Sequence, residues 1–242
     1  MKMLISILLI ACAAFVFFKQ QNDRNRLEQE FLAKVTEARN HNFVIPAVPE
    51  KDPNFSLTEA ELKKARRQAF QQKDIDSNVN AIEQLWKLQD KDAIPAIRKV
   101  LGNKYTNCYG NCANVVSHKI SLINFVSREQ TKVNLKLLMS VTKDKDVVVR
   151  TTAISALGQY LCNDVIVPLQ NLMSDRNQDV AKTAGTAFDN VFHGMKQWRE
   201  NRVDELVSEY ARKIAPLDYE RGEKKLRTLI EQHDSQEKEN VK

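Results

Sequence analysis

The sequence is poor in the residues that make tight turns. Glycine and proline each occur 6 times in 242 residues, which is below their average usage. Doubly wound sheets and barrels need many turn glycines, so this shortage disfavours both architectures. Alanine, leucine, lysine, glutamate and glutamine are abundant, and all of them favour helices. The composition therefore predicts an all-α chain.

Motifs that mark an active site are also missing. The chain has no glycine-rich phosphate loop and no nucleophile elbow. Its 4 histidines are scattered, and none forms a pair at helical spacing. We therefore expect no enzyme activity, no cofactor and no metal site.

The excess of positive charge is slight. The formal net charge is +6 in a chain with 28% charged residues, which is typical of a solvated helical surface. One short segment, KKARR, forms a candidate basic patch that could contact phosphates or anionic lipid heads; it contains Lys63, Lys64, Arg66 and Arg67. A nucleic-acid-binding solenoid is the alternative function, and we regard a nucleic-acid partner as the weaker expectation. It would require these four cations to share one groove with Lys99, Lys104, Lys119 and Arg128.

The one long apolar segment lies at the N-terminus. Residues 3–18 hold no charge and span roughly 24 Å as a helix, somewhat less than a hydrocarbon core. We favour a retained single-pass membrane anchor within segment 1–19. The second interpretation is a lipoprotein, because the sequence before Cys12 resembles a lipobox, although the apolar residues after Cys12 are unusual for one. A cleaved secretory signal is the third interpretation.

The side of the membrane is left open by two opposing signals. Lys19, Arg24 and Arg26 follow the apolar segment, and this bias favours a cytoplasmic body. Cys108 and Cys112 sit close together around Gly110, and a local disulfide there would require an oxidising compartment. We expect a bacterial inner-membrane protein with a periplasmic body, and we keep free thiols as the alternative. Zinc bound by the two cysteines and His118 would lack a fourth ligand, so we do not favour it.

Segment 20–55 is predicted to be a helical stalk followed by a linker. Leu27, Phe31 and Val35 repeat at helical spacing and form a narrow apolar seam. The seam could pair with another copy of the chain, giving a homo-oligomer through the stalk, or pack on the chain's own domain. Pro46 and Pro49 then interrupt helical structure.

Residues 56–192 contain an internal repeat. Thr58 and Glu61 have the spacing of a capping box at the start of a helix. From about residue 76, apolar positions recur at a constant offset of 72, and a weaker copy lies between the two matching stretches. Half of that offset is about 36, a period typical of stacked helical pairs. The matching pairs include Ile82 with Ile154, Leu85 with Leu157, Ile97 with Leu169 and Leu101 with Met173.

The best unit, DKDVVVRTTAISALGQY from residue 144, resembles a HEAT repeat of the short bacterial type related to phycobilisome-lyase repeats. The resemblance implies an α-solenoid of about four helical hairpins that acts as a binding scaffold. It also implies a ladder between repeats in which Asp146 and Arg150 take part.

The remaining chain is predicted to close the array. Segment 193–235 should form C-terminal capping helices, and 236–242 should be a disordered tail. The sequence as a whole predicts a membrane-tethered scaffold without catalysis. Its unidentified protein partner would lie on the concave face of the repeats, and residues 3–18 would hold it at the membrane.

Overall fold

The computed structural model describes residues 2–48, 51–71, 75–102 and 112–240, with the side chains of 2–14, 75, 112–114, 237 and 240 left undescribed. Over these residues the chain is all-α, as predicted, and contains no strand. The helices are α1 (Lys2–Arg39), α2 (Glu59–Ala69), α3 (Ile75–Lys87), α4 (Ala93–Leu101), α5 (Cys112–Val126), α6 (Lys132–Val141), α7 (Val147–Leu157), the short 3-10 helix η1 (Asn163–Val165), α8 (Ile166–Leu172), α9 (Gln178–Ile214) and α10 (Tyr219–Asn240).

The chain divides into two compact units. The helical body is Asn42–Met195, and the terminal unit combines Met1–His41 with Lys196–Lys242. Helix α9 contributes its first part to the body and its second part to the terminal unit. The boundary expected after residue 192 therefore falls inside a continuous helix.

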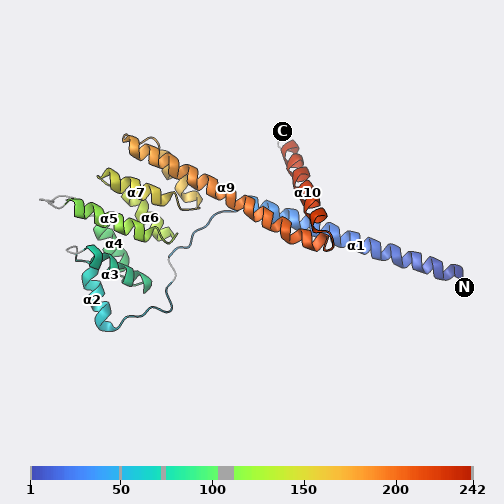
Figure 1. Cartoon of the computed structure of the whole chain (residues 1–242), viewed down its shortest axis with the longest axis horizontal. Coiled ribbons are helices and arrows are strands. Elements are labelled where there is room, and N and C mark those ends of the chain that lie inside the picture. Colours follow the sequence, from blue (N-terminus) through green and yellow to red (C-terminus); the bar gives the residue numbers. More distant parts are fainter. Residues whose placement is uncertain (1, 49–50, 72–74, 103–111, 241–242) are drawn as a thin grey trace. The chain divides into compact units, whose positions relative to one another are not determined.

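Helices of the body pack on their neighbours in the sequence and on the next helix but one. Helix α3 contacts α4 and α5, and α5 contacts α6 and α7 (Figure 1). Most of the positions matched by the internal repeat lie in this core, and Ile82, Ile154, Leu85 and Leu157 are fully buried. Packing of apolar faces between successive helices thus accounts for the periodicity of the sequence.

Local signals set several helix ends. The Thr58 side chain accepts a hydrogen bond from the Glu61 amide, and the Glu61 carboxylate accepts one from the Thr58 amide, so the predicted capping box is present at the start of α2. At the start of α6 the Thr131 side chain accepts a hydrogen bond from the amide of Asn134. These caps satisfy amides that a helix N-terminus would otherwise leave unpaired.

Residues 42–48, which follow α1 and include Pro46, form a strap that lies on the body. The amides of Lys132 and Val133 donate to the carbonyl groups of Pro46 and Ala47. Ile45 is buried in the core of the body. The strap is therefore held to the start of α6 by backbone hydrogen bonds and by one apolar anchor.

The apolar seam of α1 packs on the chain's own C-terminal helices. Phe31 and Val35 are buried against α9 and α10 in a separate core, which includes Val207, Tyr210 and Leu226. Of the two alternatives for the seam, packing within the chain is the one observed. A homo-oligomer through the stalk would have to use another face of the helix.

Helix α10 extends further than the sequence suggested. It runs to Asn240, so residues 236–240 of the expected disordered tail continue the helix, while 241–242 lie outside the described residues. Glutamate, glutamine and lysine in this stretch favour helix, and Leu226 and Ile230 anchor the earlier turns. Propensity and packing together explain why the helix does not stop at residue 235.

Within the described part of the chain, no helix combines the length and the apolar character that crossing a membrane requires. The side chains of residues 2–14, which make up most of the expected anchor and include Cys12, lie outside the described residues. Helix α1 itself is continuous from Lys2 to Arg39, so the apolar segment and the stalk belong to one helix.

Candidate functional site

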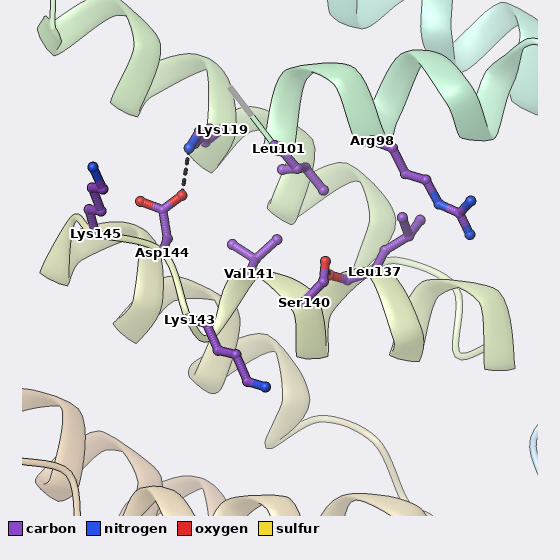
Figure 2. A pocket seen from close by; sticks show the side chains of 10 residues that line it. Arg98, Leu101, Lys119, Leu137, Ser140, Val141, Lys143, Asp144 and Lys145 are labelled. Atoms are coloured by element: carbon purple, nitrogen blue, oxygen red, sulfur yellow. Dashed lines mark hydrogen bonds and ion pairs between the residues drawn. The ribbon is translucent and has the colours of Figure 1, made fainter. Parts of the chain in front are cut away.

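A hollow of about 340 Å³ opens on the body between the C-terminal ends of α4 and α6. Helix α5 and the turn before α7 complete its wall (Figure 2). We call it the α4–α6 groove. Its lining residues are Arg98, Leu101, Gly102, Lys119, Leu137, Ser140, Val141, Lys143, Asp144 and Lys145.

The floor of the α4–α6 groove is apolar and rigid. Leu101, Leu137 and Val141 are each at least nine-tenths buried and belong to the core of the body. They are fixed by the same packing that stacks α4 on α5 and α6 on α7. A partner side chain seated here would therefore meet a preformed apolar surface.

A buried ion pair closes one side of the groove. The amine of Lys119 lies 2.5 Å from Asp144, and the two side chains are only 2% and 8% exposed. Asp144 also accepts a hydrogen bond from the amide of Asp146, at 3.0 Å. Burying two charges is tolerated only when they are paired and hydrogen-bonded, so this pair fixes α5 against the turn that precedes α7.

Three exposed cations surround the apolar floor. Arg98 comes from the last turn of α4, and Lys143 and Lys145 flank Asp144 in the turn after α6. In Figure 2 Arg98 and Lys145 lie at opposite ends of the row of labelled residues. Cations spread in this way do not enclose a single small anion. They suit an extended acidic partner, which would meet several of them in turn.

The expected ladder residues Asp146 and Arg150 hold their own turn. The carboxylate of Asp146 caps α7 by accepting hydrogen bonds from the amides of Val148 and Val149. The guanidinium of Arg150 donates to the carbonyl groups of Asp144 and Lys145, at 2.9 and 3.1 Å. Both residues thus shape the wall of the groove.

The ion pairs that link successive helical segments use other residues. Arg66 of α2 contacts Asp90 at 2.7 Å and Asp92 at 3.4 Å in the turn before α4. Lys119 contacts Asp144 in the equivalent way. Desolvation alone would raise the pKa of Asp90, but the hydrogen bonds from Arg66 and from the amide of Asp92 outweigh it and lower that pKa.

The KKARR patch is only partly available for binding. Lys63, Lys64 and Arg67 are exposed on α2, whereas Arg66 holds the two carboxylates described above. Of the other cations required by the nucleic-acid interpretation, Arg128 contacts Glu83 at 3.8 Å. Lys119 is buried in its ion pair, and Lys104 lies outside the described residues.

His118 is buried and serves the fold. Its Nε2 lies 2.7 Å from Oδ1 of Asn78. The amide nitrogen of Asn78 donates to the carbonyl groups of Gln68, Ala69 and Gln71 at the end of α2, so Oδ1 is the acceptor and Nε2 carries the proton. Desolvation lowers the pKa of His118 below its ordinary value of 6.5.

The cysteines give no further site among the described residues. Cys108, the side chain of Cys112 and the side chain of Cys12 lie outside them, so neither the disulfide nor the lipidation prediction can be placed. Cys162 is a free, buried thiol of the core, and burial raises its pKa. No group of three or more potential metal ligands occurs in the part of the chain that is described.

Sequence reasoning missed the α4–α6 groove, although one signal for it was present. Lys119 precedes Leu122, Ile123 and Val126 by three, four and seven residues, which places it on the buried face of α5. A lysine on an apolar face predicts a buried acidic partner. That partner, Asp144, is 25 residues away and could not be identified from spacing alone.

Comparison with known proteins gives no match, either to a family model or to a curated protein.

Proposed function

We propose that this chain is a membrane-tethered scaffold of HEAT-like helical pairs that binds an acidic segment of a partner protein along the α4–α6 groove. The observation that carries the proposal is the groove itself, in which a rigid apolar floor is surrounded by Arg98, Lys143 and Lys145. The partner would place apolar side chains on the floor and carboxylates against the cations. Binding of this kind needs neither a cofactor nor catalysis.

The repeat interpretation is supported by the packing of the body. Helix α3 contacts α5, and α5 contacts α7; α3 and α5 also contact the helices that follow them, α4 and α6. In HEAT-like arrays the second helix of each pair lines the concave face. In the proposed array α4 and α6 are the second helices of their pairs, and this supports a binding surface at the α4–α6 groove.

The tether is supported by the sequence of the first helix. Residues 3–18 are uncharged, and α1 carries them into the terminal unit without a break. The proposed location is a bacterial inner membrane with a periplasmic body. Intact-mass measurement of the purified protein should find residues 1–11 retained. Loss of those residues with an acyl mass on Cys12 would instead establish the lipoprotein alternative.

Site-specific photocrosslinking in cells tests the binding groove. A photoreactive residue at Lys143 or Arg98 should trap one discrete partner, and the same residue at Lys182, exposed on α9, should not. Changing Lys143 and Lys145 to glutamate should abolish the product from Arg98, while the same change at Lys63 and Lys64 should leave it. Equal products from Lys182 and Lys143 would overturn the proposal.

A topology reporter tests the proposed side of the membrane. Fused after residue 50, it should be active only in the periplasm. A thiol count on Cys108 and Cys112 in the same cells should then find both oxidised. A cytoplasmic signal would place the body on the other side and exclude the disulfide.

A further inference from the structure

The turn between α9 and α10 carries a fully exposed apolar side chain. Leu217, which follows Pro216, has a relative exposure of 101%, the highest among the exposed large apolar residues of the described chain. A single exposed leucine is ordinary on a protein surface. This one lies beside a hollow of about 660 Å³ whose other lining residues include Arg24, Arg221, Lys224 and Lys225.

Contacts within the terminal unit fix which end of α1 this turn approaches. Trp198, early in this part of α9, packs against His41 with ring centroids 4.4 Å apart. Tyr210, three turns later, packs on Phe31 at 5.5 Å. The hollow beside Leu217 is then bounded by Arg24. Helix α9 therefore runs antiparallel to α1, and its end faces the apolar N-terminal segment.

The turn reaches the level at which a bilayer surface would lie. Phe15, Phe17 and Phe18 are exposed at the end of the apolar segment, and Arg24 follows Phe18 by six residues, or about 9 Å along the helix. The headgroup layer on each side of a bilayer is about 5–8 Å thick. With residues 3–18 in the hydrocarbon, the side chains around Arg24 and the turn reach the headgroups.

The charges around the turn favour an anionic surface. Arg221 and Lys224 are exposed on the first turns of α10, and neither forms an ion pair with a described residue. Arg24 and Lys225 share the carboxylate of Glu28. The carboxylate of Asp218 accepts a hydrogen bond from the Arg221 amide at the start of α10. Two cations are therefore left to face outward beside Leu217, with Glu220 as an opposing charge.

We propose that the α9–α10 turn is a second membrane contact, in which Leu217 enters the headgroup layer while Arg221 and Lys224 bind phosphates of anionic phospholipids. The contact rests on the proposed anchoring by residues 3–18, because that anchoring sets the height of the turn above the bilayer. Its occupant is a lipid surface, since the turn continues the apolar and basic end of α1. The contact would stop the terminal unit from tilting about a single helix.

Fluorescence quenching by lipids tests the contact in the full chain. Leu217→Trp is compared with Val167→Trp, another exposed apolar position, which lies on α8 of the helical body. Both retain native Trp86 and Trp198 as a common background. The proteins are reconstituted into brominated phosphatidylcholine vesicles with and without phosphatidylglycerol, and flotation confirms that they are membrane-bound. Lipid quenching of the new tryptophan should be strong at position 217, more so with phosphatidylglycerol, and weak at position 167.

Charge variants separate this contact from the anchor. Replacing Arg221 and Lys224 by glutamine in the Leu217→Trp chain should reduce lipid quenching. Each cation removed should lower the equilibrium constant for contact between the turn and the lipid surface by about fivefold. Glutamine at Lys63 and Lys64 should have no effect, and Glu220→Gln should increase quenching. A higher salt concentration should reduce quenching at position 217 as the two glutamine substitutions do.

The outcomes distinguish the two proposals. If the protein floats with the vesicles but positions 217 and 167 are quenched equally, the second contact is refuted and the anchor survives. If quenching at position 217 changes neither with phosphatidylglycerol nor when Arg221 and Lys224 are replaced by glutamine, the phosphate contact is refuted. If the full chain does not float with vesicles at all, the anchoring proposal fails and this contact fails with it.

Discussion

Replacing Gly158 by alanine should weaken the body, because α9 packs directly on that glycine. A Cβ atom at position 158 would lie 2.9 Å from both Cα and Cβ of Ala187 and 3.3 Å from the carbonyl oxygen of Ser155. Gly158 itself has φ −64°, which suits any residue. The need for glycine at the end of α7 is therefore one of space rather than backbone conformation.

The size of the effect follows from that overlap. Carbon atoms in ordinary contact lie about 3.5–4.0 Å apart, so α7 and α9 would have to separate by roughly 0.6–1 Å. Overpacking of this kind costs about 1–3 kcal/mol. Alanine also restricts the unfolded chain, which returns about 0.4–1 kcal/mol. The midpoints of the two ranges leave a net loss of unfolding free energy of about 1.3 kcal/mol, or about 3–5 °C in Tm.

Thermal and urea unfolding of the full chain in mild detergent, followed by circular dichroism, measures this loss. Gly185→Ala is the matched control, since Gly185 lies inside α9 and its new Cβ would meet only the methyl group of Met173, at 4.0 Å. It should stabilise the body by up to about 1 kcal/mol, as glycine is a poor helix former. Opposite signs for the two variants support the packing argument. A Gly158→Ala chain as stable as the parent would refute it.

Three further changes probe the buried polar groups of the body. Lys119→Met should cost about 3–5 kcal/mol in urea unfolding, because it leaves Asp144 buried without its counter-charge; adding Asp144→Asn should recover part of that loss. Asn78→Ala should cost about 2–3 kcal/mol, since the buried imidazole of His118 and the carbonyl groups at the end of α2 lose their partner. Acidification should also destabilise the parent. Burial lowers the pKa of His118, so the unfolded chain binds the proton first, and the contribution is complete above pH 6.5 and lost as the pH falls through the folded pKa. Unfolding midpoints measured from pH 7.5 to 5 should fall less steeply in His118→Gln, and equal slopes would contradict this assignment.

The 72-residue offset predicted burial correctly for some of the paired positions and not for others. Ile97 and Leu169 are both fully buried, as the 72-residue offset predicts. The same offset pairs Leu101 with Met173, but Leu101 is buried and Met173 is 46% exposed. Met173 is the C-cap residue after the end of α8 at Leu172, whereas Leu101 is still inside α4. The repeated spacing alone therefore does not fix which positions are buried.

Long-range pairing set the limit of prediction in the terminal unit. The spacing of Leu27, Phe31 and Val35 showed an apolar seam, but it could not show what covers it. Tyr210, which covers Phe31 and donates a hydrogen bond to Glu30, is 180 residues away from that glutamate. No periodic signal links such distant segments. A seam of this kind therefore predicts burial, and only the folded chain identifies the partner.

Cations that hold helical segments together are not available to a binding partner. Arg66 belongs to the basic KKARR segment and Lys119 is a further cation of the nucleic-acid interpretation, yet each forms an ion pair between helical segments. Counting cations along the chain therefore overstates what a partner can reach. Arg98, Lys143 and Lys145 remain exposed around an apolar floor that the core holds rigid. The α4–α6 groove combines exposed cations with an apolar floor held by the core, and for this reason we propose it as the binding surface.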